Sequence, residues 1–124
     1  GEPEAALEEI QKEHSYVWKT AFLPIVYHAA GQQENADASL SAFIEEFGSV
    51  GAFQIAENYA YRGEIDLAFE WLERAYTQRD GGLTLILSDR FLVNLHDDAR
   101  WEPFLEKMNL LEYWQAMKER EAEA

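Results

Sequence analysis

Residues 55–75 read IAENYAYRGEIDLAFEWLERA, and this stretch decides the fold. Its apolar residues recur every three or four positions on both sides of Gly63, which is typical of two amphipathic helices. Glycine ends a helix readily because it adopts the left-handed conformation at no steric cost. A connection of two or three residues makes the two helices antiparallel, so the stretch predicts a helical hairpin.

A second copy of this pattern lies 32 residues upstream. Residues of the same kind match at five positions: Tyr27 and Tyr59, Gly31 and Gly63, Leu23 and Ile55, Ala36 and Ala68, Leu40 and Leu72. A period in the low thirties predicts a stacked array of helical hairpins. We therefore expect an all-α fold, a right-handed superhelix of about seven or eight helices.

The chain is expected to form one domain over residues 1–124. Residues 3–14 would be the tail of a preceding hairpin, 15–48 the first repeat, 50–82 the second, and 83–124 diverged capping helices. Within the last part, helices are predicted over 99–108 and 110–121. The apolar run of residues 83–87 is assigned to a helix as well, because an isolated strand would have no partner. Pro24 cannot donate a hydrogen bond to the carbonyl of Thr20, so a kink or local break is expected there.

The second copy resembles the tetratricopeptide repeat (TPR). Large apolar, small, aromatic and turn residues stand where that family has them: Ile55, Ala56, Tyr59, Gly63, Ala68, Leu72 and Ala75. The first copy diverges, since Pro24 and Phe43 replace small residues. The resemblance implies that the first helix of each hairpin lines a concave groove that holds another protein.

Residues 61–80 and 95–110 resemble the last repeats of bacterial multidomain signalling proteins, class III adenylate cyclases and winged-helix regulators among them. This narrower resemblance implies a C-terminal regulatory or sensory segment of a larger protein. Prolines usual in that family are replaced here by Gly81, Arg90, Asn94 and Ala99. Any enzymatic effector domain would lie outside these residues.

Composition limits the partners. The chain is 48% hydrophobic, enough for a core and too apolar for disorder. Its net charge of -14 repels phosphate backbones and anionic lipid, so neither nucleic-acid binding nor direct membrane contact is expected. With no cysteine there is no disulfide and no thiolate metal site. We expect a cytoplasmic protein, or a periplasmic one if the parent protein has a transmembrane helix.

No catalytic, cofactor-binding or metal site is predicted. His14, His28 and His96 lie far apart, whereas a metal needs several converging ligands. The serines lack the GxSxG pattern of a hydrolase nucleophile, and Asp97 or Asp98 is explained by helix capping. We therefore expect no enzyme activity in this segment.

A groove is predicted from positions that face away from the core of each hairpin: Trp18, Ile25, His28, Phe53, Glu57 and Tyr61. This aromatic and acidic strip suits a peptide with apolar side chains and a lysine or arginine. Alternatively, another helix of the chain fills the strip, for example residues 110–121. Two other functions remain open: a homodimerisation module, and a small-molecule sensor. The sensor would need a closed apolar pocket with converging polar groups.

Overall fold

The protein is all-helical in the part that the structure, a computed structural model, describes, which is residues 16–17 and 19–123. Residues 19–29 form a helix, and seven helical elements follow: α2 (Gln33–Phe47), α3 (Ala52–Tyr61), α4 (Ile65–Gln78), η1 (Gly81–Leu85), η2 (Arg90–Leu95), α5 (Trp101–Lys107) and α6 (Leu111–Glu123). The prediction of an all-α fold with about seven or eight helices is confirmed. The segment 3–14 lies outside the described residues.

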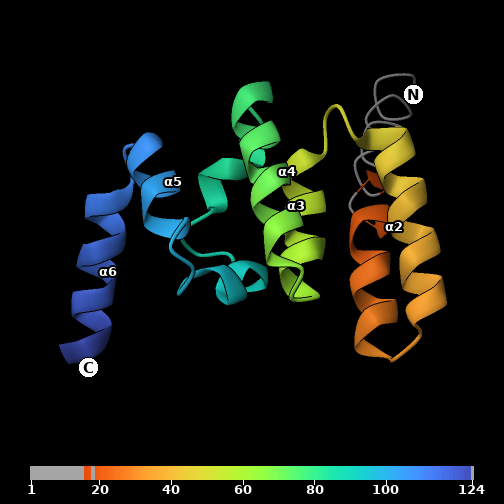
Figure 1. The fold of residues 1–124 in the computed structure, drawn as a ribbon, viewed down its shortest axis with the longest axis horizontal. Helices are drawn as coiled ribbons and strands as arrows, with labels where there is room; N and C mark the ends of the chain where they lie inside the picture. Colours follow the sequence, from red (N-terminus) through yellow and green to blue (C-terminus); the bar gives the residue numbers. More distant parts are fainter. Residues whose placement is uncertain (1–15, 18, 124) are drawn as a thin grey trace, which may run out of the picture.

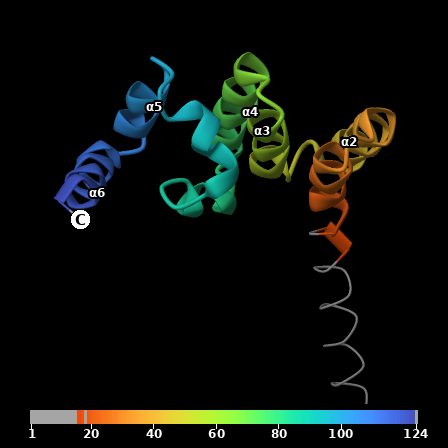
Figure 2. The same cartoon turned by 90° about the horizontal axis from the view of Figure 1, so that it is seen from below.

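The helices stand side by side in a curved row, with α2 at one end and α6 at the other (Figures 1 and 2). Helices α3 and α4 occupy the middle. The short 3₁₀ helices η1 and η2 lie on the inner side of the curve, beside α3 (Figure 2). None of the helices in the described residues is both long enough and apolar enough to cross a membrane.

The repeated tyrosine and glycine end the first helix of each hairpin in the same way. Gly31 has a φ of +77° and Gly63 a φ of +79°, the left-handed conformation that glycine accepts. The amide of Gln32 donates to the carbonyl of Tyr27, and the amide of Glu64 donates to that of Tyr59, each at 2.9 Å. The sequence repeat therefore corresponds to a repeated helix ending.

Helix α3 is the centre of the core. Its residues Ala52, Phe53, Ile55, Ala56 and Ala60 are all buried, and it contacts α4, η2, α2 and η1. Small residues at its interface with α4 let the two helices approach closely. Since α3 is covered on nearly every side, its few polar side chains lie in a low-dielectric environment.

Most predicted helices are present, with some shifted bounds. Pro24 causes no break, because residues 19–29 are continuously helical across it. Residues 83–87 are not a strand: they begin inside η1 and continue into a turn. Helix α5 begins at Trp101, later than expected, and the Asp98 side chain accepts a hydrogen bond from the amide of Arg100 just before it.

Candidate functional site

Two asparagine side chains hold neighbouring elements against α3. Buried Asn58 donates from Nδ2 to the carbonyl of Ala21 at 2.9 Å, which ties α3 to the helix of residues 19–29. Asn94 of η2 donates from Nδ2 to the carbonyl of Ala60, also at 2.9 Å. These bonds place the first helix and η2 on the same helix α3.

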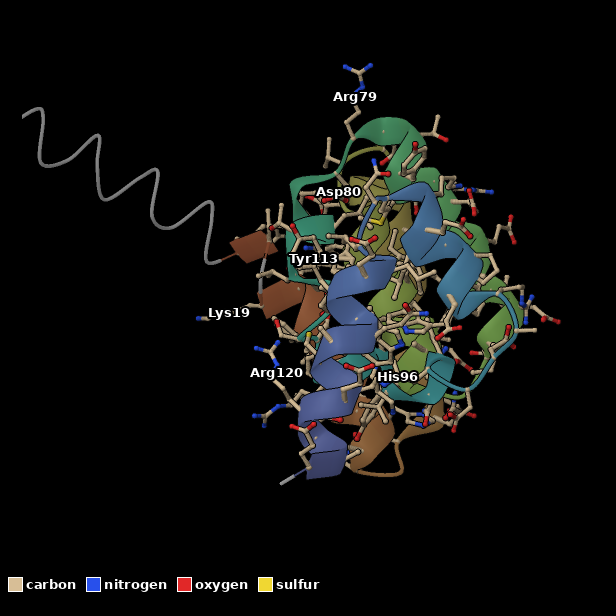
Figure 3. All side chains as sticks on the ribbon, turned by 90° about the vertical axis from the view of Figure 1, so that its left-hand side faces the viewer. Lys19, Arg79, Asp80, His96, Tyr113 and Arg120 are labelled. Atoms are coloured by element: carbon tan, nitrogen blue, oxygen red, sulfur yellow. The ribbon has the colours of Figure 1, made fainter. Side chains whose placement is uncertain are left out.

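Asp80 fixes the start of η1 against the start of α3. Its Oδ2 accepts from the amide of Phe53 at 3.1 Å, and its Oδ1 accepts from the amide of Gly82 at 2.8 Å. A carboxylate at the start of α3 also interacts favourably with the helix dipole. Figure 3 labels Asp80 at this end of the molecule, with the side chain of its neighbour Arg79 projecting outward.

Gly82 lets η1 approach α3 closely. A Cβ at this position would meet Phe53 Cδ1 at 2.6 Å and Phe53 Cβ at 3.0 Å. Real side chains do not tolerate such distances. The absence of a side chain at Gly82 therefore sets the spacing between η1 and α3.

Between these elements lies a cavity of about 230 Å³, which we call the α3 cavity. Its apolar wall consists of Phe22 from the first helix, Phe53 from α3 and Leu85 from η1. Gly82 contributes to it as well. Its polar side chains come from α3, from the two residues before η2 and from the first residue of η2: Gln54, Glu57, Ser88, Asp89 and Arg90.

Glu57 is the only acidic side chain among the described residues that is buried, with 7% of its surface exposed. Burial raises the pKa of its carboxyl to about 10, and a hydrogen bond to Asp89 and the negative charges of Asp89 and Asp80 act in the same direction. Glu57 is therefore protonated at neutral pH. In that state its O–H group donates a hydrogen bond to the side chain of Asp89.

Among the residues of the predicted groove, the structure brings Phe53 and Glu57 together in the α3 cavity. Ile25 is buried. His28 and Tyr61 are half-buried, with ring centroids 5.7 Å apart, and His28 Nδ1 lies 3.1 Å from Gln33 Oε1. Trp18 lies outside the described residues.

An aromatic row joins these residues to the cavity. The ring of Phe22 lies 5.5 Å from that of Phe91, and Phe91 lies 5.9 Å from Tyr61, which in turn contacts His28. The α3 residues of the predicted strip, Phe53, Glu57 and Tyr61, thus lie against residues of η1, η2 and the segment between them. Residues 110–121, the alternative cover, mostly belong to α6, which packs against α5.

Sequence reasoning missed Asp89 and its contact with Glu57. One weak signal was present, because Asp80 and Asp89 each precede a short apolar run. Each side chain accepts from the amide two residues further along, Gly82 and Phe91 respectively. This pattern predicts turns or helix starts, but not which helix the segment covers.

A second cluster of polar and aromatic side chains lies between α5 and α6. The His96 ring centroid is 4.8 Å from that of Trp101 and 4.6 Å from that of Trp114. In Figure 3, which views the molecule from its α6 end, His96 is labelled beside that helix. Burial lowers the pKa of His96, and the charge of Lys118 adds to this effect.

Among the described residues, neither the α3 cavity nor the cluster around His96 offers a metal site. Within the described part of the chain, no three side chains of the histidine, cysteine, aspartate or glutamate type come together in a way that could hold an ion. Asp80 uses both carboxylate oxygens for backbone amides. The α3 cavity combines two carboxyl groups, those of Glu57 and Asp89, with an apolar wall.

Comparison with known proteins yields no match to a family model, a curated protein or a solved structure.

Proposed function

We propose that this chain is a non-enzymatic protein–protein interaction module of the TPR type, the C-terminal regulatory part of a larger bacterial signalling protein. The observation that carries the proposal is the α3 cavity, which opens beside aromatic and apolar side chains and has a buried carboxyl at its side. Its volume of about 230 Å³ is below the roughly 300–1,000 Å³ of typical small-molecule sites. A hole of this size suits one side chain of a partner.

The surface around the cavity supports the same proposal. Leu85 lines the cavity and is 53% exposed, so an apolar side chain is accessible beside the cavity. Interface hot spots typically combine a pocket with an apolar surround that excludes water. The chain's net charge of -14 would steer a basic partner toward it.

A catalytic role for Glu57 is less well supported. General acid–base catalysis is most effective when the pKa of the acting group lies near the working pH. With a pKa of about 10, the free Glu57 carboxyl is poorly matched to proton transfer at neutral pH. The carboxyl pair is better suited to binding.

The proposal is tested by replacing an exposed residue of the cavity wall. Wild-type protein, Leu85→Glu and the control Val50→Glu would be used to capture proteins from an extract of the source organism. Val50 is also exposed but lies in the turn before α3 and is not one of the residues that line the cavity. We expect one captured protein that, once purified, binds wild type and Val50→Glu equally and Leu85→Glu at least about tenfold more weakly.

Equal binding to all three proteins would contradict a partner site at the cavity. Capture of the chain's own parent protein alone, with a doubled mass in sedimentation, would instead favour the homodimerisation module. In the described residues, the large apolar side chains exposed at the surface include no tryptophan or phenylalanine that would mark such an interface.

A further inference from the structure

We propose that the α3 cavity binds the cationic end of a lysine or arginine side chain, with the aliphatic stem along Phe22, Phe53 and Leu85 and the charged group at Glu57 and Asp89. This inference rests on the proposed function, because it assigns the chemistry of the partner's anchoring residue. It concerns an alkylammonium or alkylguanidinium group.

The shape of the cavity favours a slender group with an apolar stem. Two phenylalanine rings and Leu85 form the apolar wall, while the acidic groups come from α3 and from the residue before η2. Lysine and arginine side chains bury their methylene groups on apolar surface and place the charge beyond them. A cation near a phenylalanine ring gains a further electrostatic attraction.

The charged groups around Glu57 favour a cation over an anion or a neutral group. Asp89 shares a hydrogen bond with Glu57, and Asp80 adds negative charge although both its oxygens already accept backbone amides. The proton on Glu57 now reduces the repulsion between these carboxyls. A bound cation can replace it: the proton leaves to solvent, and the ionised Glu57 and Asp89 bind the cation together.

Among the described residues, Arg90 is the one cation that lines the cavity. Its side chain is exposed at the start of η2, where it opposes an incoming cation by charge repulsion. Replacing it with glutamine should therefore strengthen cation binding. This change acts in the opposite direction to loss of Glu57, so the pair of variants separates a charge effect from damage to the fold.

The direct test uses small probes and nuclear magnetic resonance. n-Butylguanidinium and n-butylammonium would be titrated into the whole protein, with n-butanol as the neutral control, while the amides of Phe53 and Gly82 and the Glu57 carboxyl carbon are observed. We expect both cations, but not butanol, to shift these signals, and the Glu57 carbon to change from its protonated to its ionised position. Because a proton is released, affinity for butylguanidinium should rise by up to about tenfold per pH unit between pH 6 and 8.

Variants complete the test. Glu57→Gln should bind the cations at least about tenfold more weakly, Arg90→Gln more tightly, and the exposed control Glu45→Gln as wild type does. Circular dichroism and thermal unfolding of each variant establish that it is folded. If butanol binds as well as the cations, or Glu57→Gln binds them unchanged, the inference is wrong.

The result also separates this inference from the proposed function. One outcome is that a purified partner binds in a Leu85-dependent way while neither cation shifts the cavity signals. That result would support the proposed interaction module and contradict the proposed cation site. If the cations bind but no protein partner is captured, the cavity is a site for small organic cations, and the proposed interaction module is wrong. Replacing the partner's anchoring lysine or arginine with methionine should abolish binding if both are right.

Discussion

Gly82 and Gly81 are neighbours with opposite surroundings. A Cβ on Gly82 would collide with Phe53, whereas a Cβ on Gly81 would have nothing within 4 Å. We expect Gly82→Ala to lower the free energy of unfolding by about 1–3 kcal/mol, because overpacking must push η1 away from α3. Gly81→Ala should change it by less than about 1 kcal/mol.

Urea unfolding of both variants at pH 7 measures this difference. Equal stability of the two alanine variants would show that η1 does not depend on close contact with Phe53. Cation binding provides a second readout, since a displaced η1 would also widen the α3 cavity.

The raised pKa of Glu57 predicts an unusual dependence of the free energy of unfolding on pH. Its folded pKa of about 10 lies above the ordinary value of 4.5, so the folded state keeps a proton that the unfolded state has released. The stability from this proton is fully present below pH 4.5 and is lost as pH rises toward 10. Relative to Glu57→Gln, which cannot ionise, wild type should lose up to about 1.4 kcal/mol per pH unit between pH 5 and 9.

Urea unfolding at several pH values compares wild type with Glu57→Gln. Glu45→Gln, which changes an exposed carboxylate of α2, should follow wild type. Parallel curves for wild type and Glu57→Gln would mean that Glu57 is ionised in the folded protein.

Helix α6 is held at the end of the row by aromatic contacts that involve His96. Burial, followed by the charge of Lys118, lowers the pKa of His96 below its ordinary 6.5, while Asp97 and Glu121 oppose the shift. The folded state therefore binds fewer protons than the unfolded state in this range. The stability from neutral His96 is present above pH 6.5 and is lost as pH falls below it.

We expect acidification from pH 7.5 to 5.5 to loosen α6 from Trp101, because protonated His96 favours water. Tryptophan fluorescence would report the exposure of Trp114. His96→Gln should remove the response and His28→Gln should keep it. A response that survives in His96→Gln would assign the change to other groups.

The elements that the sequence predicted best are those with a regular apolar period. Helix α4 belongs to the hairpin predicted from residues 55–75, and its buried residues Ala68, Leu72 and Ala75 recur every three or four positions. The 3₁₀ segments were harder to predict. They are short, and each starts at an aspartate side chain that binds a backbone amide, which many turns also do.

Only part of the candidate site could be predicted from the sequence, because local patterns do not show how distant segments pack together. Phe53 and Glu57 were identified because their spacing places them on one face of a helix. What covers that face depends on where residues 81–95 return, and this is decided by contacts such as Asn94 with the carbonyl of Ala60. No local pattern shows that Asp89 lies against Glu57.

The whole molecule carries 24 acidic and 10 basic side chains. Its exposed ion pairs, such as Arg74 with Glu70 and Arg100 with Asp66, contribute little, typically up to about 1 kcal/mol each. Repulsion among the remaining carboxylates acts over the entire surface and destabilises the compact state. Salt should therefore stabilise this protein, since it screens more repulsion than attraction.

We expect the melting temperature to rise by roughly 2–5 °C between 20 and 300 mM NaCl at pH 7. Differential scanning calorimetry measures it. Replacing exposed Glu112 and Glu119 with glutamine should raise the low-salt value and reduce the salt effect. A fall in melting temperature with salt would mean that the ion pairs outweigh the repulsion.

The ring contact between Phe22 and Phe91 has a consequence for the order of folding. The hydrogen bonds that tie α3 to its neighbours link residues 27, 34 and 37 positions apart, so each can form soon after its partner leaves the ribosome. Phe22 and Phe91 are about twice as far apart in the sequence as the partners in these hydrogen bonds. The α3 cavity thus depends on the contact with the longest sequence separation of these four, and whatever occupies it would slow unfolding without hastening the folding steps that precede that contact.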